Sequence, residues 1–219
     1  MSTKRCFLLF FIVILFSSQL FAQLGIKAGV NVSSEVRDNI KNWEDVKNFS
    51  ADNLNGFHVG LIYQIPFTTT GGGFGAEIGA FFSQKGSFFS YDKEDDLSGT
   101  LTKAYNELNY AEVPLNLRYT LSLGAIGFFG SAGVYAGYMF SGKTVDETAK
   151  EVSKMEFSEF TDKLDYGCTL GVGIDFLRKI QLGVSWSRGL KTNEIKIGSL
   201  DKVLDSQNST ISVGLAYIF

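Results

Sequence analysis

The feature that most restricts the fold is an alternation of side-chain character with a period of two, clearest in NYAEVPLNLRYTL, residues 109–121. Its apolar alternate positions are Val113, Leu115, Leu117 and Tyr119. The positions between them are Glu112, Pro114, Asn116 and Arg118. Successive side chains of a β-strand point to opposite faces. The segment therefore predicts a strand with one hydrocarbon face and one face that carries both charges.

Eight segments repeat this alternation, and each is predicted to form a strand. They are residues 23–33, 56–67, 73–89, about 104–120, 125–142, 163–176, 179–190 and 209–219. Three of the connections are short, with the sequences TTTGG, LSLG and LRK, and the others are long and polar, at 34–55, 90–103, 143–162 and 191–208. Short turns at one end of the strands and long loops at the other are typical of outer-membrane barrels.

Besides charged residues, the polar face of these strands carries many glycines, such as Gly171 and Gly173. Such a face is a poor surface for a soluble protein, but it fits the narrow lumen of an eight-stranded barrel. The apolar face is then expected to contact lipid, with aromatic residues near the strand ends as in interfacial girdles. A soluble lipocalin-like barrel is the alternative, and it would turn the apolar face inward.

An open sheet edge in hydrocarbon leaves backbone N–H and C=O groups unsatisfied, so the first and last strands are expected to pair. The predicted fold is all-β: an eight-stranded antiparallel transmembrane up-and-down β-barrel with short periplasmic turns and long extracellular loops. This fold predicts a protein of the cell outer membrane, in contact with outer-membrane lipid.

Residues 1–22 have the three-part layout of a secretory signal peptide. Lys4 and Arg5 precede the apolar run 6–16, and a cleavage point follows Ala22. The apolar run is shorter than the roughly 20 residues that a transmembrane helix needs. The predicted organisation is therefore a signal peptide at 1–22 and an outer-membrane β-barrel domain at 23–219. Loss of the signal leaves Cys168 alone, which excludes a disulfide framework.

The charged residues of the polar face are predicted to form a network inside the lumen, because buried charges need partners. Its candidate members are Lys27, Glu77, Glu112, Asn116 and Arg118. Pro114 lacks the N–H that a ladder requires, and it is predicted to mark a bulge or a local break in pairing. The net charge of −3 indicates no nucleic-acid partner.

Four stretches together resemble a known family: the signal end FAQ, the first-strand GIKAGVNVS, the fourth-strand YAEVPLNLRY and the C-terminal ISVGLAYIF. They are similar to the small outer-membrane barrels of Bacteroidota known as the porin family or PorT-like domain. The resemblance implies the same fold and location. It also implies that the last strand, with Tyr217 and Phe219, is a signal read by the barrel insertion machinery. It brings no catalytic residues.

The function expected from these observations is structural, adhesive or accessory, without catalysis, with unknown extracellular or envelope partners bound by the long loops. One alternative is a narrow pore or a secretion or transport accessory barrel. A second alternative is an outer-membrane lipid-modifying enzyme, for which His58 is the one histidine available. No nucleophile with a base at supporting spacing is found, so no pattern predicts a catalytic residue. No cofactor-binding residue or metal ligand is predicted either: the carboxylates of YDKEDD, residues 91–96, have the chemistry to bind a divalent cation, but a solvated loop tip is the favoured interpretation.

Overall fold

The computed structural model describes residues 23–37, 50–68, 72–92, 101–146, 151–154, 163–191, 193–196 and 203–219. These residues contain ten strands: β1 (Gln23–Arg37), β2 (Ser50–Pro66), β3 (Gly73–Asp92), β4 (Leu101–Leu123), β5 (Ile126–Asp146), β6 (Glu151–Lys154), β7 (Leu164–Phe176), β8 (Ile180–Gly189), β9 (Asn193–Lys196) and β10 (Val203–Ile218). The signal peptide predicted for 1–22 lies outside the described residues. No helix in the described part of the chain has the length and apolar character needed to cross a membrane.

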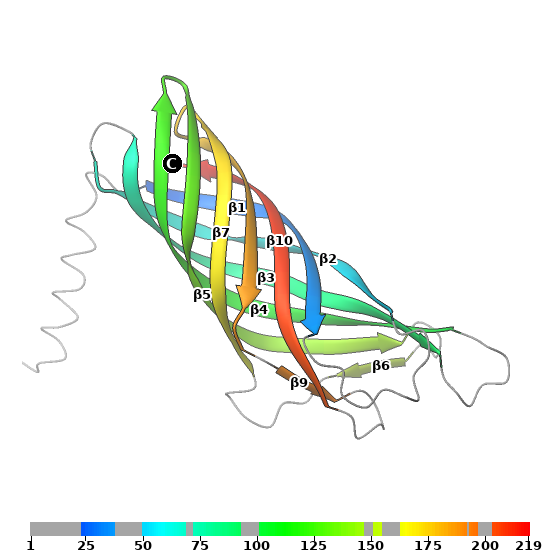
Figure 1. Ribbon diagram of the computed structural model, residues 1–219. Helices are drawn as coiled ribbons and strands as arrows, with labels where there is room; N and C mark the ends of the chain where they lie inside the picture. The colour runs from blue at the N-terminus through cyan, green and yellow to red at the C-terminus, as the bar shows by residue number, and fades with distance from the viewer. Residues whose placement is uncertain are drawn as a thin grey trace, which may run out of the picture.

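The eight long strands form a closed antiparallel barrel (Figure 1). Each long strand pairs with the next along the chain, and β1 pairs with β10 from Gly25↔Ile218 to Arg37↔Ser206. The predicted eight-stranded antiparallel barrel is therefore confirmed. Closure leaves no free sheet edge at the level where the side chains of the outer face are apolar.

Six of the eight long strands run further toward the loop end than predicted, β7 and β8 being the exceptions, and two short strands were not predicted. β6 pairs with β5, and β9 pairs with β10, within connections that were expected to be loops. β4 and β5 stay paired up to Ala104↔Asp146. Ladder hydrogen bonds need only backbone, so pairing continues past the region where apolar and polar residues alternate.

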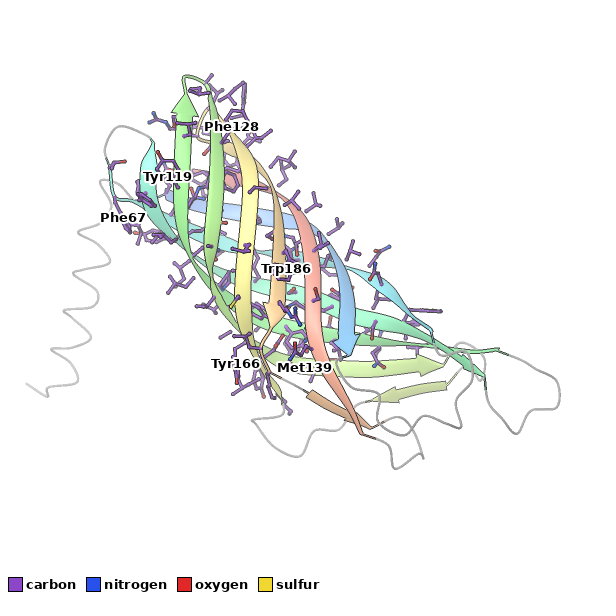
Figure 2. The ribbon with its side chains drawn as sticks, viewed as in Figure 1. Phe67, Tyr119, Phe128, Met139, Tyr166 and Trp186 are labelled. Carbon is purple, nitrogen blue, oxygen red and sulfur yellow. The ribbon has the colours of Figure 1, made fainter. Side chains whose placement is uncertain are left out.

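The apolar face of the barrel points outward, as predicted. On β4 the exposed fractions are 48% for Val113 and 52% for Leu117, but 9% for Asn116 and 6% for Arg118. Figure 2 shows Phe67, Tyr119 and Phe128 near the end that carries the short turns, and Tyr166 toward the other end. This exposed apolar belt, with aromatic residues at both ends, is the surface expected to contact lipid.

Pro114 does not lie in a bulge, so that alternative of the prediction is wrong, but the local break in pairing is present on the side of β3. The register between β4 and β5 is continuous through Pro114↔Tyr135, and it shifts instead between Asn109 and Tyr110. Toward β3 the paired residues stop at Ile78↔Leu115 and resume at Phe81↔Glu112 in the same register. A proline removes one donor without adding a residue, so it interrupts the ladder and leaves the register unchanged.

The turn between β7 and β8 has an unusual backbone. Leu177 and Arg178 have φ values of 53° and 57°, and the N–H of Lys179 donates to the carbonyl of Phe176 at 3.0 Å. Tight hairpin turns with two positive φ values usually carry Asn-Gly. Here two residues with large side chains adopt the left-handed region, which costs roughly 1–2 kcal/mol per residue.

Candidate functional site

The lumen near the short turns is crossed by a hydrogen-bonded network centred on Arg118. Its Nη1 atom donates to Glu77 Oε2 at 3.1 Å and to Gln181 Oε1 at 3.2 Å, and Nη2 lies 3.5 Å from Asp175 Oδ2. Gln64 Nε2 donates to Glu77 Oε2 at 2.7 Å and to Gln181 Oε1 at 2.9 Å. The five residues come from β2, β3, β4, β7 and β8. We call this set the Arg118 network.

A row of glycines makes room for the ring of Phe129, which packs against Arg118. Paired luminal positions on β1, β10, β8 and β7 are Gly29, Gly214, Gly183 and Gly173. A Cβ on Gly173 would lie 2.3 Å from the ring of Phe129, which shows that the ring covers the bare backbone there. The guanidinium carbon of Arg118 lies 3.6 Å from the centroid of the same ring. Phe129 is thus held between the glycines and a cation, an arrangement that favours a cation–π contact.

Farther along the lumen, Asn31 on β1 joins residues from three other strands. Its Oδ1 atom lies 2.8 Å from Nδ1 of His58 and accepts a hydrogen bond from Ser212 Oγ at 2.7 Å. Its Nδ2 atom donates to Ser83 Oγ at 3.1 Å. His58 is 7% exposed and packs edge-on against Phe81 with ring centroids 5.9 Å apart. The ring of His58 is therefore inside the barrel and held by an amide.

A second network crosses the lumen toward the loop end. Lys85 forms an ion pair with Glu112, and its ammonium lies 4.7 Å from the ring centroid of Tyr135. The hydroxyl of Tyr135 donates to Asp165 Oδ2 at 3.2 Å, and Asn208 Nδ2 donates to the same oxygen at 3.1 Å. Strands β3, β4, β5, β7 and β10 are connected in this way. We call this set the Lys85 network.

Between the two networks lies a cavity of about 110 Å³. Charged residues from β1, β3 and β4 line one side, including Lys27, Glu77 and Glu112. Hydroxyl side chains from β5, β7, β8 and β10 line the other side: Ser131, Thr169, Ser185, Ser187 and Ser212. The cavity is large enough for ordered water, since one water needs about 10–15 Å³ of such space and several polar partners.

The luminal residues predicted from the sequence are all inside the barrel, but they do not form one network. Glu77 and Arg118 are joined directly, whereas Glu112 pairs with Lys85. Asn116 lines the cavity, and its Oδ1 atom has no hydrogen-bond partner among the described residues. Lys27 also lines the cavity.

Sequence reasoning missed Lys85, Tyr135 and Asn208. Lys85 lies an even number of positions from Glu77, so the period of two places both side chains on the luminal face. The alternation in SQKGS is the signal that identifies Lys85 as luminal. Tyr135 and Asn208 carried weaker signals, because tyrosine occurs on either face and Asn208 lies where a loop was expected.

The sequence matches the family described as outer membrane protein beta-barrel domain over residues 16–193. The chain belongs to this outer-membrane β-barrel family. The family and the closed barrel together establish the protein as an integral outer-membrane protein. Among curated protein sequences, none matches this chain.

Solved structures similar to this chain are outer-membrane barrels. Ail, the attachment invasion locus protein of Yersinia pestis, is 15% identical with a TM-score of 0.43, covering 91% of this chain and 99% of Ail. OprG from Pseudomonas aeruginosa is 16% identical with a TM-score of 0.45, covering 91% of this chain and 96% of OprG. The outer membrane enzyme PagL is 11% identical with a TM-score of 0.44, covering 88% of this chain and 98% of PagL. These likenesses concern the fold alone and transfer no role.

Proposed function

We propose that the protein is a non-catalytic integral barrel with a filled polar lumen, and that its structural, adhesive or accessory role is carried by the loop end. The observation that carries the proposal is the Arg118 network, which joins five strands across the lumen. The Lys85 network crosses the lumen a second time. Two crossings stabilise the barrel and obstruct an axial path for solutes.

Planar-bilayer recording tests the filled lumen. The purified barrel is expected to give no stable single-channel steps, because the Arg118 network would have to open for an ion to pass. Steady conductance steps from the unmodified protein would overturn the proposal. They would favour the alternative of a narrow pore or transport accessory, for which the hydroxyl-lined cavity between the networks is the supporting observation.

The position of His58 supports the absence of lipid-modifying activity. An enzyme that acts on membrane lipid needs its base and nucleophile on a surface that lipid can reach. The ring of His58 instead lies in the lumen, hydrogen-bonded to Asn31. Lipid A from cells that produce the protein is expected to have the same mass spectrum with wild-type barrel and with His58→Ala. A modification present only with wild type would establish the enzyme alternative.

The partners proposed for the barrel act at its two ends. Tyr217 and Phe219 lie on the outer face with ring centroids 5.6 Å apart, which supports recognition of the last strand by the barrel insertion machinery. Removal of Phe219 is expected to reduce the amount of folded, heat-modifiable protein in outer membranes. Unknown extracellular or envelope partners are sought by crosslinking from residues 34–55 and 143–162 on intact cells.

We also assign the protein to the PorT-like barrels of Bacteroidota, on the strength of YAEVPLNLRY and ISVGLAYIF.

A further inference from the structure

The barrel wall is interrupted between β3 and β4, inside the apolar belt. The ladder lacks the pairs Gly79↔Pro114 and Ala80↔Val113, although the register is the same on both sides of them. We call these four residues the Pro114 break. A proline is normally confined to sheet edges or bulges, because it cannot donate to the ladder. Parting the two strands here therefore breaks fewer hydrogen bonds than parting them elsewhere along the same ladder.

The Pro114 break is covered from the inside by two rings. A Cβ on Gly79 would lie 2.3 Å from the ring of Phe81 and 3.1 Å from Cγ of Pro114, so both rings lie close to the bare backbone of Gly79. The Phe81 ring also covers Gly60 on β2, where a Cβ would lie 2.6 Å from it. On the outer face Ala80 is exposed and has only a methyl group. Side-chain packing, with one mobile ring at its centre, thus closes the wall at this point.

The break adjoins the cavity between the two networks, because Phe81 and Pro114 both line that cavity. Along the barrel axis the cavity is closed by the Arg118 network on one side and by the Lys85 network on the other. Axial entry would require one of these networks, each of which contains a buried ion pair, to open. Lateral entry requires the ring of Phe81 to rotate and two strands to part where their pairing is already interrupted. The side route is therefore the less obstructed one.

The lining of the cavity indicates the chemistry of a ligand. The charged residues that line it are two carboxylates and two cations, and their formal charges cancel: Glu77, Glu112, Lys27 and Arg118. This balance favours an uncharged ligand. Ser185 lines the cavity from β8, which lies across the barrel from β3 in the order of the eight long strands. Its hydroxyl is able both to donate and to accept a hydrogen bond, so it suits a neutral polar group.

We propose that the luminal cavity binds a small uncharged amphiphile that enters from the bilayer through the Pro114 break, with the ring of Phe81 as the movable cover. The apolar part of the ligand lies against Phe81, and its hydroxyl or carbonyl group reaches Ser185. This site is separate from the structural, adhesive or accessory role proposed above. It needs no axial channel, so both networks stay closed while the ligand enters.

A cysteine reporter in the cavity tests the route of entry. Ser185→Cys is made in a chain whose own cysteines, Cys6 and Cys168, are replaced by serine, and the barrel is placed in lipid vesicles. It is exposed to N-ethylmaleimide, which is uncharged and dissolves in lipid, or to a small sulfonated methanethiosulfonate. Labelling is followed by intact-protein mass spectrometry, and each rate is divided by the rate for unfolded chain. The uncharged reagent is expected to be at least roughly tenfold faster, because a fixed charge does not cross hydrocarbon readily.

A disulfide across the break separates lateral from axial entry. Ala80→Cys with Val113→Cys joins the outer faces of β3 and β4, and in its oxidised form it is expected to slow labelling of the reporter roughly tenfold or more, since the strands then cannot part. Ala76→Cys with Leu117→Cys is the matched control, because these residues are partners on the same two strands, four positions away. The control disulfide should leave the labelling rate unchanged. Both disulfides are verified in the same spectra as the loss of two hydrogens.

Crystals of the unmodified barrel test the ligand site without any variant. Crystals soaked in bromohexanol are expected to show an anomalous bromine peak in contact with the ring of Phe81, with the alcohol oxygen directed toward Ser185. The proposal is overturned if the charged reagent labels the reporter as fast as the uncharged one, or if the disulfide at the break has no more effect than its control. It is also overturned if the soaked crystals contain bromine only on the outer face.

Discussion

Removal of the guanidinium of Arg118 should destabilise the barrel strongly. Arg118→Met keeps the length of the side chain but leaves Glu77 and Asp175 without the cation that lies 3.1 Å and 3.5 Å from them. Breaking a buried ion pair by deleting one partner costs about 3–5 kcal/mol, because the remaining charge is left buried and uncompensated. The lost contact with Phe129 at 3.6 Å adds to this effect. We expect a decrease of about 3–5 kcal/mol in the free energy of unfolding.

The measurement is urea unfolding of the detergent-solubilised barrel, followed by tryptophan fluorescence, with the slope m compared between variants. Arg188→Met is the matched control, because Arg188 lies on the outer face and makes one 3.4 Å hydrogen bond, to Gln207. It should change stability by less than about 0.5 kcal/mol.

A triple variant separates charge from packing. Arg118→Met combined with Glu77→Gln and Asp175→Asn removes the uncompensated charges together with the cation. Replacement of a whole buried ionic cluster is often neutral, so this variant should recover most of the loss. The reasoning is refuted if Arg118→Met costs less than about 1 kcal/mol, or if the triple variant is as unstable as the single one.

Three further predictions concern backbone positions and the lumen. Gly173→Val should destabilise the barrel by about 1–3 kcal/mol, because its Cβ would lie 2.3 Å from Phe129. Gly130→Val is the control and should not destabilise it, since a Cβ there meets nothing within 4 Å. The urea midpoints of the two variants are compared, and equal losses at both sites would contradict the reasoning. Leu177→Asn with Arg178→Gly should raise the urea midpoint by relieving two positive φ angles, and a lower midpoint would show that the present turn is not strained. Tyr135→Phe should destabilise the barrel by about 0.5–1.5 kcal/mol, because Asp165 Oδ2 loses the 3.2 Å hydrogen bond from Tyr135 but keeps the 3.1 Å hydrogen bond from Asn208. Unchanged stability would exclude this role.

The fold followed from the sequence because it rests on a property that alternate residues carry locally. Leu117 and Arg118 reveal their opposite faces by chemistry alone, and lipid contact explains why the apolar face is outside. The pairing inside the lumen did not follow. Glu112 lies close in sequence to Arg118, yet it pairs with Lys85 on another strand. Partners of this kind depend on the register of several ladders at once, which alternation does not encode.

The ends of most strands on the side of the long connections were also beyond prediction. The ladder between β4 and β5 continues to Ala104↔Asp146, where the local sequence is polar and resembles a loop. The missing N–H of Pro114 predicted a bulge or a local break in pairing. The structure has the break, on the side of β3, and no bulge, because the register stays constant on both sides. Backbone pairing depends on the neighbouring strand, so one strand's composition predicts its limits poorly.

The length of β4 has a consequence for how the protein meets its surroundings. Its exposed apolar positions run from Val113 to Leu123, and the strand then continues from Tyr110 to Leu101 beyond that belt. At about 3.4 Å per residue and a tilt of about 40°, this extension rises roughly 25 Å above the lipid. The paired strands thus form a stalk beyond the apolar belt. A ligand held at its tip would stand clear of the headgroups, so a large or surface-attached ligand could be bound without approaching the bilayer.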